Sequence, residues 1–262
     1  MDEIRVASWT ELNEAVYASS WQEELGRFRS NFAFRGVGDA SDDLRTGLMR
    51  LGDDYARLEG HLLRNFRKYA RVGEMPNDSL RDWFELAQHH GLPTRLQDWT
   101  YSPYVALHFS TAELDLFGRD GAVWSIDYSR ANQLLPARMK AVLDEENADV
   151  FTAEMLGRAA GTLPELDSIG DSPFVLFFEP PSLDERIVNQ YALFALISSP
   201  TASLGDWVEQ HPDAARKIVI PAEMKWEVRD KLDQANITER VLFPGLDGLS
   251  QWLRRYYTPR TH

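Results

Sequence analysis

The sequence contains no cysteine. This absence excludes disulfide bonds, thiol catalysis and cysteine-ligated zinc or iron–sulfur sites, and it is compatible with a reducing compartment. The sequence also lacks an apolar run near the ~20 residues that a membrane-spanning helix needs, since its longest candidate is only Tyr191–Ser199. The first residues, Met1–Ile4, are acidic and do not form a basic segment ahead of an apolar one, so we expect no secretory signal. We therefore expect a cytoplasmic protein that makes no membrane contact.

Basic residues are outnumbered by acidic ones. The 262 residues include 28 Lys and Arg against 41 Asp and Glu, which gives a formal net charge of −13. Broad, sequence-independent binding of nucleic acid relies on a basic surface, so we do not expect it here. Arginines still cluster at Arg27–Arg50 and Arg64–Arg71, where they could hold a small anion or lie solvated on helix faces. Phosphate-loop, GxSxG and HExxH motifs are missing too, and we expect no metal site.

The apolar pattern predicts a mixture of helices and strands. Helical spacing and capping residues predict helices at 8–29, 54–72, 79–90, 102–110, 222–235 and 246–256. Runs rich in β-branched and aromatic residues predict strands at 31–36, 121–128, 173–179, 191–199 and 217–220. Because these elements are interleaved without a linker or repeat, we expect one α+β domain over residues 1–262. It would have an N-terminal helical portion at 1–30 and a core at 31–262.

The segment Gln88–Phe109 (QHHGLPTRLQDWTYSPYVALHF) places polar side chains beside bulky apolar ones, as in a partly dry pocket. Within it, Arg95 and Asp98 could form a buried ion pair that fixes a loop. Ser102 or Thr100 occupies the start of the next helix, as a plain cap or as a contact for an anion. We interpret the segment as one wall of a pocket, with Asp98 as its main chemical group.

Two other positions could complete that pocket. In Phe34-Arg35-Gly36, an arginine at a strand end stands beside a glycine whose backbone can approach a ligand closely. A guanidinium holds phosphate or carboxylate in a fork, although Arg35 could equally pair with a structural Asp at a turn. Arg186 and Gln190 share a face whether their segment is helix or strand. The alternative is that this pair satisfies loop and backbone groups.

Together these blocks resemble the FRG-domain family of bacterial and phage proteins, from about residue 32 to the C-terminus. The matching residues are Phe34-Arg35-Gly36, Gln88–Leu96, Asp98-Trp99-Thr100, Ser102-Pro103 with Ala106, Leu107 and Phe109, Arg186-Ile187 with Gln190 and Phe194, and Leu242–Pro244 with Leu246–Gly248. The chain departs from the family pattern at Gln97, where an apolar residue is usual, and at Ala192, where a glycine is expected. The family is named for a motif, so this resemblance implies a shared fold more than an activity.

The order of these residues is also similar to the R–S–E layout of NAD-dependent ADP-ribosyltransferases. That resemblance implies a mixed, mainly antiparallel split sheet with N-terminal and flanking helices. It implies that Arg35 grips an NAD phosphate and that Thr100 or Ser102 braces the nicotinamide ribose. Gln190 would stand where transferases place a catalytic glutamate. Because a glutamine cannot act as a base, Asp98, Glu179 or Glu185 would have to supply the carboxylate.

Two functions follow as expectations. The first is an NAD-binding, ADP-ribosyltransferase-like enzyme, a toxin or anti-phage effector that modifies a macromolecule, with NAD as co-substrate. Its catalytic residues would be Asp98, Gln190 and Arg35, and its ligand contacts would be Arg35, Gly36, His90, Arg95, Thr100, Ser102 and Arg186. The alternative is a non-catalytic sensor or interaction module on the same scaffold, which binds a nucleotide-like or phage-derived ligand.

Overall fold

The computed structural model describes residues 2–70, 86–88, 90–180 and 185–259. These residues contain an eight-stranded sheet, made of β1 (Asp2–Arg5), β4 (Phe32–Val37), β5 (Leu96–Thr100), β6 (Gly121–Asp127), β7 (Phe151–Thr152), β8 (Val175–Glu179), β9 (Ala192–Ile197) and β10 (Ala215–Ile220). The spatial order is β1-β10-β6-β4-β5-β9-β8-β7. Only the edge pairs β1/β10 and β7/β8 are parallel, and the pairs between them are antiparallel. The expected α+β class with a mainly antiparallel sheet is therefore confirmed.

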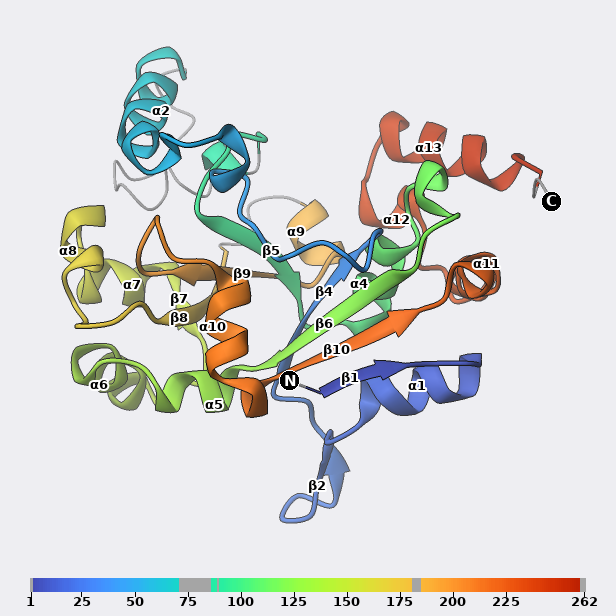
Figure 1. The fold of residues 1–262 in the computed structure, drawn as a ribbon, viewed down its shortest axis with the longest axis horizontal. Helices are drawn as coiled ribbons and strands as arrows, with labels where there is room; N and C mark the ends of the chain where they lie inside the picture. Colours follow the sequence, from blue (N-terminus) through green and yellow to red (C-terminus); the bar gives the residue numbers. More distant parts are fainter. Residues whose placement is uncertain (1, 71–85, 89, 181–184, 260–262) are drawn as a thin grey trace.

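Helices cover both faces of this sheet (Figure 1). They are α1 (Trp9–Tyr17), α2 (Tyr55–Tyr69), α4 (Pro103–Ser110), α5 (Tyr128–Gln133), α6 (Ala137–Glu146), α7 (Ala153–Ala159), α8 (Leu163–Asp167), α9 (Glu185–Asn189), α10 (Leu204–Gln210), α11 (Lys225–Gln234), α12 (Glu239–Leu242) and α13 (Leu246–Tyr256). Short 3₁₀ turns lie at Met49–Leu51, Leu114–Leu116, Pro212–Ala214 and Ala222–Met224. No helix of the described part is long and apolar enough to cross a membrane.

The buried apolar side chains of the described residues form three clusters. One cluster packs α10 and the loop at Leu44 on one face, where Trp99 and Trp124 are among the sheet residues. The opposite face carries the other two clusters. There, α1, α4 and α11 cover β4, β6 and β10. The helices α2, α6, α7 and α8 cover β5, β8 and β9. The core on this second face is therefore divided between the two halves of the sheet.

The division falls between β4 and β5, the two central strands. They pair at a single position, Phe34 with Thr100, whereas β4 pairs with β6 along its whole length, from Phe32 to Val37. Figure 1 shows β4 and β5 meeting at one end and diverging toward the other. The sheet is thus split at its centre, and polar groups of both strands that would otherwise be paired become available there.

The N-terminal region departs from the prediction of one helix over residues 8–29. Helix α1 begins at Trp9, after Ser8, whose hydroxyl accepts a hydrogen bond from the Glu11 amide, and it ends at Tyr17. The strands β2 (Trp21–Gln22) and β3 (Arg27–Phe28) then form a hairpin. The turn of this hairpin contains Gly26 at a φ of 58°. The rings of Trp21 and Phe28 face each other across its strands, with centroids 5.1 Å apart. The prediction was wrong because a glycine turn and a cross-strand aromatic pair end the helical pattern.

Most other predicted elements are present within a few residues of their expected ends. The predicted helix at 79–90 lies mainly outside the described residues, of which 86–88 are helical. Strand β5 was not predicted, and neither were the short edge strands β1 and β7. The omission of β5 matters most because this strand forms one side of the split.

Candidate functional site

A pocket of about 220 Å³ lies at the split, and we call it the split pocket. Its polar lining comprises Arg35, Gln88, Asp98, Thr100, Arg186 and Gln190. Its apolar lining includes Phe34, Trp99, Phe109, Ile187, Leu193 and Phe194. The structure therefore brings together residues from the FRG tripeptide, the central segment and the late Arg186/Gln190 pair, which are far apart in the sequence.

Arg35 bridges the two diverging strands. Its Nη1 donates to the carbonyl oxygen of Asp98 at 2.6 Å, in the role that a strand N–H plays in a regular ladder. Its Nε is buried and has no hydrogen-bond partner among the described residues. Burial lowers the pKa of the guanidinium, an effect that the nearby Asp98 carboxylate opposes. An arginine remains charged after such a shift, so the split pocket contains a cation with a spare donor.

Gly36 has a structural role that the sequence did not reveal. It lines the split pocket, but a Cβ at this position would lie 1.8 Å from the carbonyl oxygen of Ala106 and 2.7 Å from the amide nitrogen of Ser110. Both atoms belong to the backbone of α4. The glycine therefore permits the close approach of a helix to β4, where we had expected the close approach of a ligand.

Asp98 is the only acidic residue among the described residues that line the split pocket. Its side chain is exposed, between the buried neighbours Gln97 and Trp99 of β5. The other two candidate carboxylates lie elsewhere. Glu179 accepts a hydrogen bond from the Tyr101 hydroxyl at 2.9 Å, and Glu185, at the start of α9, is not part of the lining. If the pocket needs a carboxylate, Asp98 supplies it.

Thr100 and Ser102 shape the chain next to the pocket. The Thr100 hydroxyl donates to the carbonyl oxygen of Gln190 at 2.7 Å and accepts from the Ser102 amide at 3.0 Å. The Ser102 hydroxyl accepts from the amide of Val105 at 3.3 Å and caps α4, with Pro103 in the first turn. Thr100 lines the split pocket, whereas Ser102 does not, so the capping interpretation holds for Ser102.

Arg186 and Gln190 both face the pocket, from α9 and the residue after its end. The Gln190 side-chain amide donates to the carbonyl oxygen of Leu242 at 2.9 Å, which satisfies a free carbonyl at the end of α12. The Arg186 guanidinium lies 5.0 Å from the centre of the Phe243 ring. Sequence reasoning missed these contacts, although the Leu-Phe-Pro block at 242–244 was a signal that could have linked the two segments.

Besides Ser102, two more predicted ligand contacts lie away from the split pocket. Arg95 is buried and does not pair with Asp98. It binds Glu59 through Nε at 2.8 Å and Asp167 through Nη1 at 2.5 Å, so it joins β5 to α2 and α8. His90 is exposed and is absent from the lining. Among the described residues, no group of three or more histidine or acidic side chains is placed to hold a metal ion.

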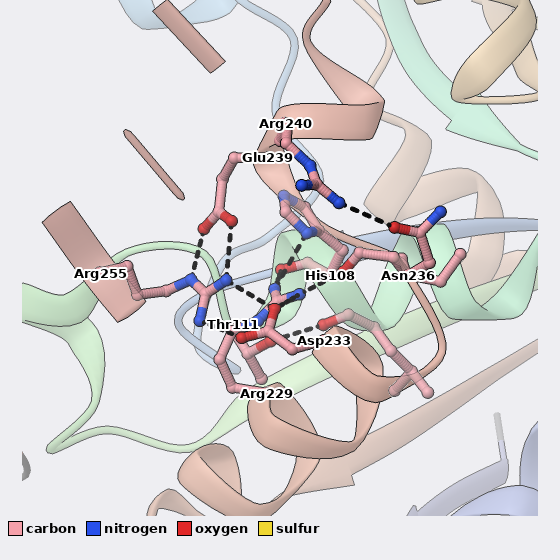
Figure 2. Close-up of polar contacts among 10 residues, drawn as sticks. His108, Thr111, Arg229, Asp233, Asn236, Glu239, Arg240 and Arg255 are labelled. Carbon is pink, nitrogen blue, oxygen red and sulfur yellow. Dashed lines mark hydrogen bonds and ion pairs between the residues drawn. The ribbon is translucent and has the colours of Figure 1, made fainter. Parts of the chain in front are cut away.

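A buried polar network joins residues of α4, α11, α12 and α13 (Figure 2). Arg255 makes a two-pronged contact with Glu239 at 2.6 and 2.8 Å and a second one with Asp233. Arg229 lies 3.0 Å from Nδ1 of His108. Burial, followed by the charge of Arg229, lowers the pKa of His108 to about 3. His108 is therefore neutral, and the network joins the C-terminal helices to α4.

Comparison with known proteins gives one family. Residues 30–117 match the model of the FRG domain. No curated protein and no solved structure matches the chain. The matched segment contains Arg35, Gly36, Asp98, Thr100 and Ser102 together with β4, β5 and α4, whereas α9 and the helices after it lie beyond it. The predicted blocks from Phe34 to Phe109 fall inside this match, so residues 30–117 are similar to the FRG domain, while the blocks at 186–194 and 242–248 lie beyond it and stay a prediction.

Proposed function

We propose that the protein binds NAD at the split pocket and acts as an ADP-ribosyltransferase-like enzyme on a macromolecule. The observation that carries this proposal is the presence of Arg35, Arg186 and Asp98 in the lining of one pocket. Two guanidinium groups favour a phosphate-bearing ligand, because each offers a rigid set of donors. One exposed carboxylate beside them favours a reaction in which positive charge develops.

The chemistry assigns a separate role to each residue. In the transfer, the bond between the ribose C1′ and nicotinamide breaks, and C1′ forms a bond to a nucleophile of the acceptor. Asp98 would stabilise the positive charge at C1′ and take the proton of the nucleophile, while nicotinamide leaves with the bonding electrons. Arg35 and Arg186 would hold the diphosphate. At about 220 Å³, the pocket is below the ~300–1,000 Å³ of a typical ligand site, so it would enclose one end of the dinucleotide.

The direct test is release of labelled nicotinamide from NAD, measured with and without a cell extract as acceptor. We expect the Asp98→Asn variant to lose about a hundredfold in rate, because a general base contributes about 10²–10⁴. Its fold should be retained, because the Asp98 side chain is exposed. The matched control is Asp115→Asn, at an exposed acidic residue outside the pocket. Equal rates for wild type and Asp98→Asn would overturn the catalytic assignment.

A second candidate is a non-catalytic module that binds a nucleotide-like ligand. The observation that favours it is the hydrogen bond from the Gln190 amide to Leu242, because it commits this side chain to a structural contact. For such a module, NAD or ADP-ribose would raise the melting temperature without nicotinamide release. The Asp98→Asn variant would then retain its ligand affinity, while Arg35→Ala would lose it.

A further inference from the structure

A second pocket, of about 500 Å³, lies beside Trp124 on the α10 face of the sheet. We call it the acidic pocket, because Asp43, Asp53, Asp206 and Glu209 are part of its lining. Asp53 lies in the loop before α2, and the last two residues belong to α10, so two separate parts of the chain supply the negative charge.

The charge of the acidic pocket is largely uncompensated. Arg45 is its only basic lining residue among those described, and it pairs with Asp43 at 2.7 Å. Asp53, Asp206 and Glu209 are exposed and form no ion pair within the described residues. Three nearby carboxylates repel an anion and attract a cation. The lining thus selects for a positively charged ligand.

Trp124 provides a second, independent indication of a ligand. The side chain is 6% exposed and lines the pocket, and its indole Nε1 has no acceptor among the described residues. An indole nitrogen only donates, and a buried donor without a partner costs free energy. Trp124 stands directly between Arg35 of β4 and Lys217 of β10 in the sheet, and Lys217 is itself paired with Glu3. A ligand that offers an acceptor would satisfy the indole N–H.

We infer that the acidic pocket binds a lysine or arginine residue of a polypeptide. The ammonium or guanidinium group contacts Asp53, Asp206 and Glu209, and a carbonyl oxygen of the same residue accepts from Nε1 of Trp124. Basic peptides combine these two features, a cation and a nearby backbone acceptor. The Nζ of Lys217 already lies 5.3 Å from the centre of the Trp124 ring, so the ring available to a ligand cation is that of Tyr55, which also lines the pocket.

This inference goes beyond the proposed function and does not depend on it. The split pocket and the acidic pocket are neighbours in space. Arg35 lines the first and Trp124 lines the second, and these two residues are direct cross-strand partners. Side chains of such partners stand on the same face of a sheet, about 5 Å apart. In an ADP-ribosyltransferase, the acidic pocket would hold a basic segment of the acceptor protein beside the bound co-substrate.

The test uses N-acetyl-L-arginine amide and agmatine as probes, without NAD. Binding is measured by calorimetry and by the indole N–H resonances of ¹⁵N-labelled protein, with that of Trp124 assigned through Trp124→Phe. We expect the Asp206→Asn/Glu209→Gln double variant to bind both probes about tenfold more weakly, as loss of two partly exposed charge contacts implies. The control, Asp115→Asn/Glu145→Gln, makes the same change in net charge at exposed residues outside the pocket.

The two probes separate the contact to Trp124 from the contact to the carboxylates. N-acetyl-L-arginine amide carries a carbonyl acceptor and agmatine does not. The Trp124→Phe substitution should therefore weaken binding of the arginine amide and leave binding of agmatine unchanged. The Trp124 resonance should move on addition of the amide. The inference is overturned if N-acetyl-L-citrulline amide, which lacks the charge, binds as tightly as the arginine amide, or if neither basic probe binds. Because NAD is absent, these outcomes leave the proposed transfer reaction untouched.

Discussion

Arg35 donates to the carbonyl oxygen of Asp98 at the point where β4 and β5 separate. The guanidinium therefore has two features: it replaces a missing backbone contact between the strands, and it belongs to a residue that lines the split pocket. Its position explains why an arginine in the FRG tripeptide serves both the fold and the site. An alanine at this position would leave the Asp98 carbonyl without this donor.

The Arg35→Lys variant separates these two features. A lysine ammonium is a compact charge and cannot hold a phosphate in a fork, so ADP-ribose should bind at least about tenfold more weakly. The stability loss should be smaller than for Arg35→Ala, because an ammonium can still donate to Asp98. Calorimetric titration and chemical unfolding measure the two effects. Unchanged ADP-ribose affinity in Arg35→Lys would show that the fork is not used.

The Gly36→Ala substitution should destabilise the protein by about 3 kcal/mol or more, because the added methyl group meets backbone atoms of α4 that cannot rotate away. The Gly60→Ala substitution is the matched control. Gly60 is exposed in the interior of α2, where an alanine Cβ would have no other atom within 4 Å, and alanine should stabilise the helix by about 1 kcal/mol. Urea unfolding of both variants measures the two changes in the free energy of unfolding, which should have opposite signs.

The sequence predicted the sheet class and some of the residues that line the split pocket, among them Arg35, Asp98 and Gln190, but not how they meet. Continuous apolar runs identified the buried strands β6, β8 and β9, since their periodicity and length are local properties. Strand β5 escaped notice because Asp98 faces the pocket and Gln97 faces the core, where its amide donates to the carbonyl of Leu44. That hydrogen bond explains the departure from the family pattern at Gln97. It could not be predicted, because its acceptor lies 53 residues away.

The same limit explains the error at Arg95. Asp98 was a reasonable partner by spacing, yet Arg95 binds Glu59 and Asp167, which are 36 and 72 residues distant. Partners at such distances are set by the packing of α2 and α8 onto the sheet and leave no local pattern. Arg186 and Gln190, in contrast, are close enough in sequence that both open interpretations, helix and strand, placed them on one face.

The buried Arg95 contact gives a prediction about stability. The Arg95→Met substitution should cost about 3–5 kcal/mol, because Glu59 would remain as a buried charge without its partner. The Arg95→Met/Glu59→Leu double variant should recover much of this loss. Arg138→Met, at the exposed pair with Glu165, is the control and should change stability by less than about 1 kcal/mol. A loss at Arg95→Met as small as at Arg138→Met would contradict the network.

Gln190→Glu tests whether a missing glutamate limits catalysis. The change removes the amide donor to Leu242 and places a carboxylate against a carbonyl oxygen, so we expect a destabilisation of about 1–3 kcal/mol. We expect no gain in nicotinamide release, because Asp98 already supplies the carboxylate of the split pocket. The Gln88→Glu variant, at another pocket residue, is the control for added charge. A rate increase specific to Gln190→Glu would show that this position can serve as the catalytic carboxylate.

His108 makes stability fall in mild acid. Its folded pKa of about 3 is below the ordinary 6.5, so the unfolded chain binds the proton first, and stability is lost as pH falls from 6.5 toward 3. The loss from this group should reach about 2 kcal/mol by pH 5, at 1.36 kcal/mol per unit. Burial raises the pKa of Glu239, but the hydrogen bonds and charge of Arg255 outweigh this and lower it to about 2. Protonation of Glu239 therefore reduces stability only below about pH 4.5. In His108→Gln, stability measured in urea should therefore fall less between pH 7.5 and 5 than in wild type. Parallel pH profiles for the two proteins would contradict a buried neutral His108, because the remaining histidines are common to both.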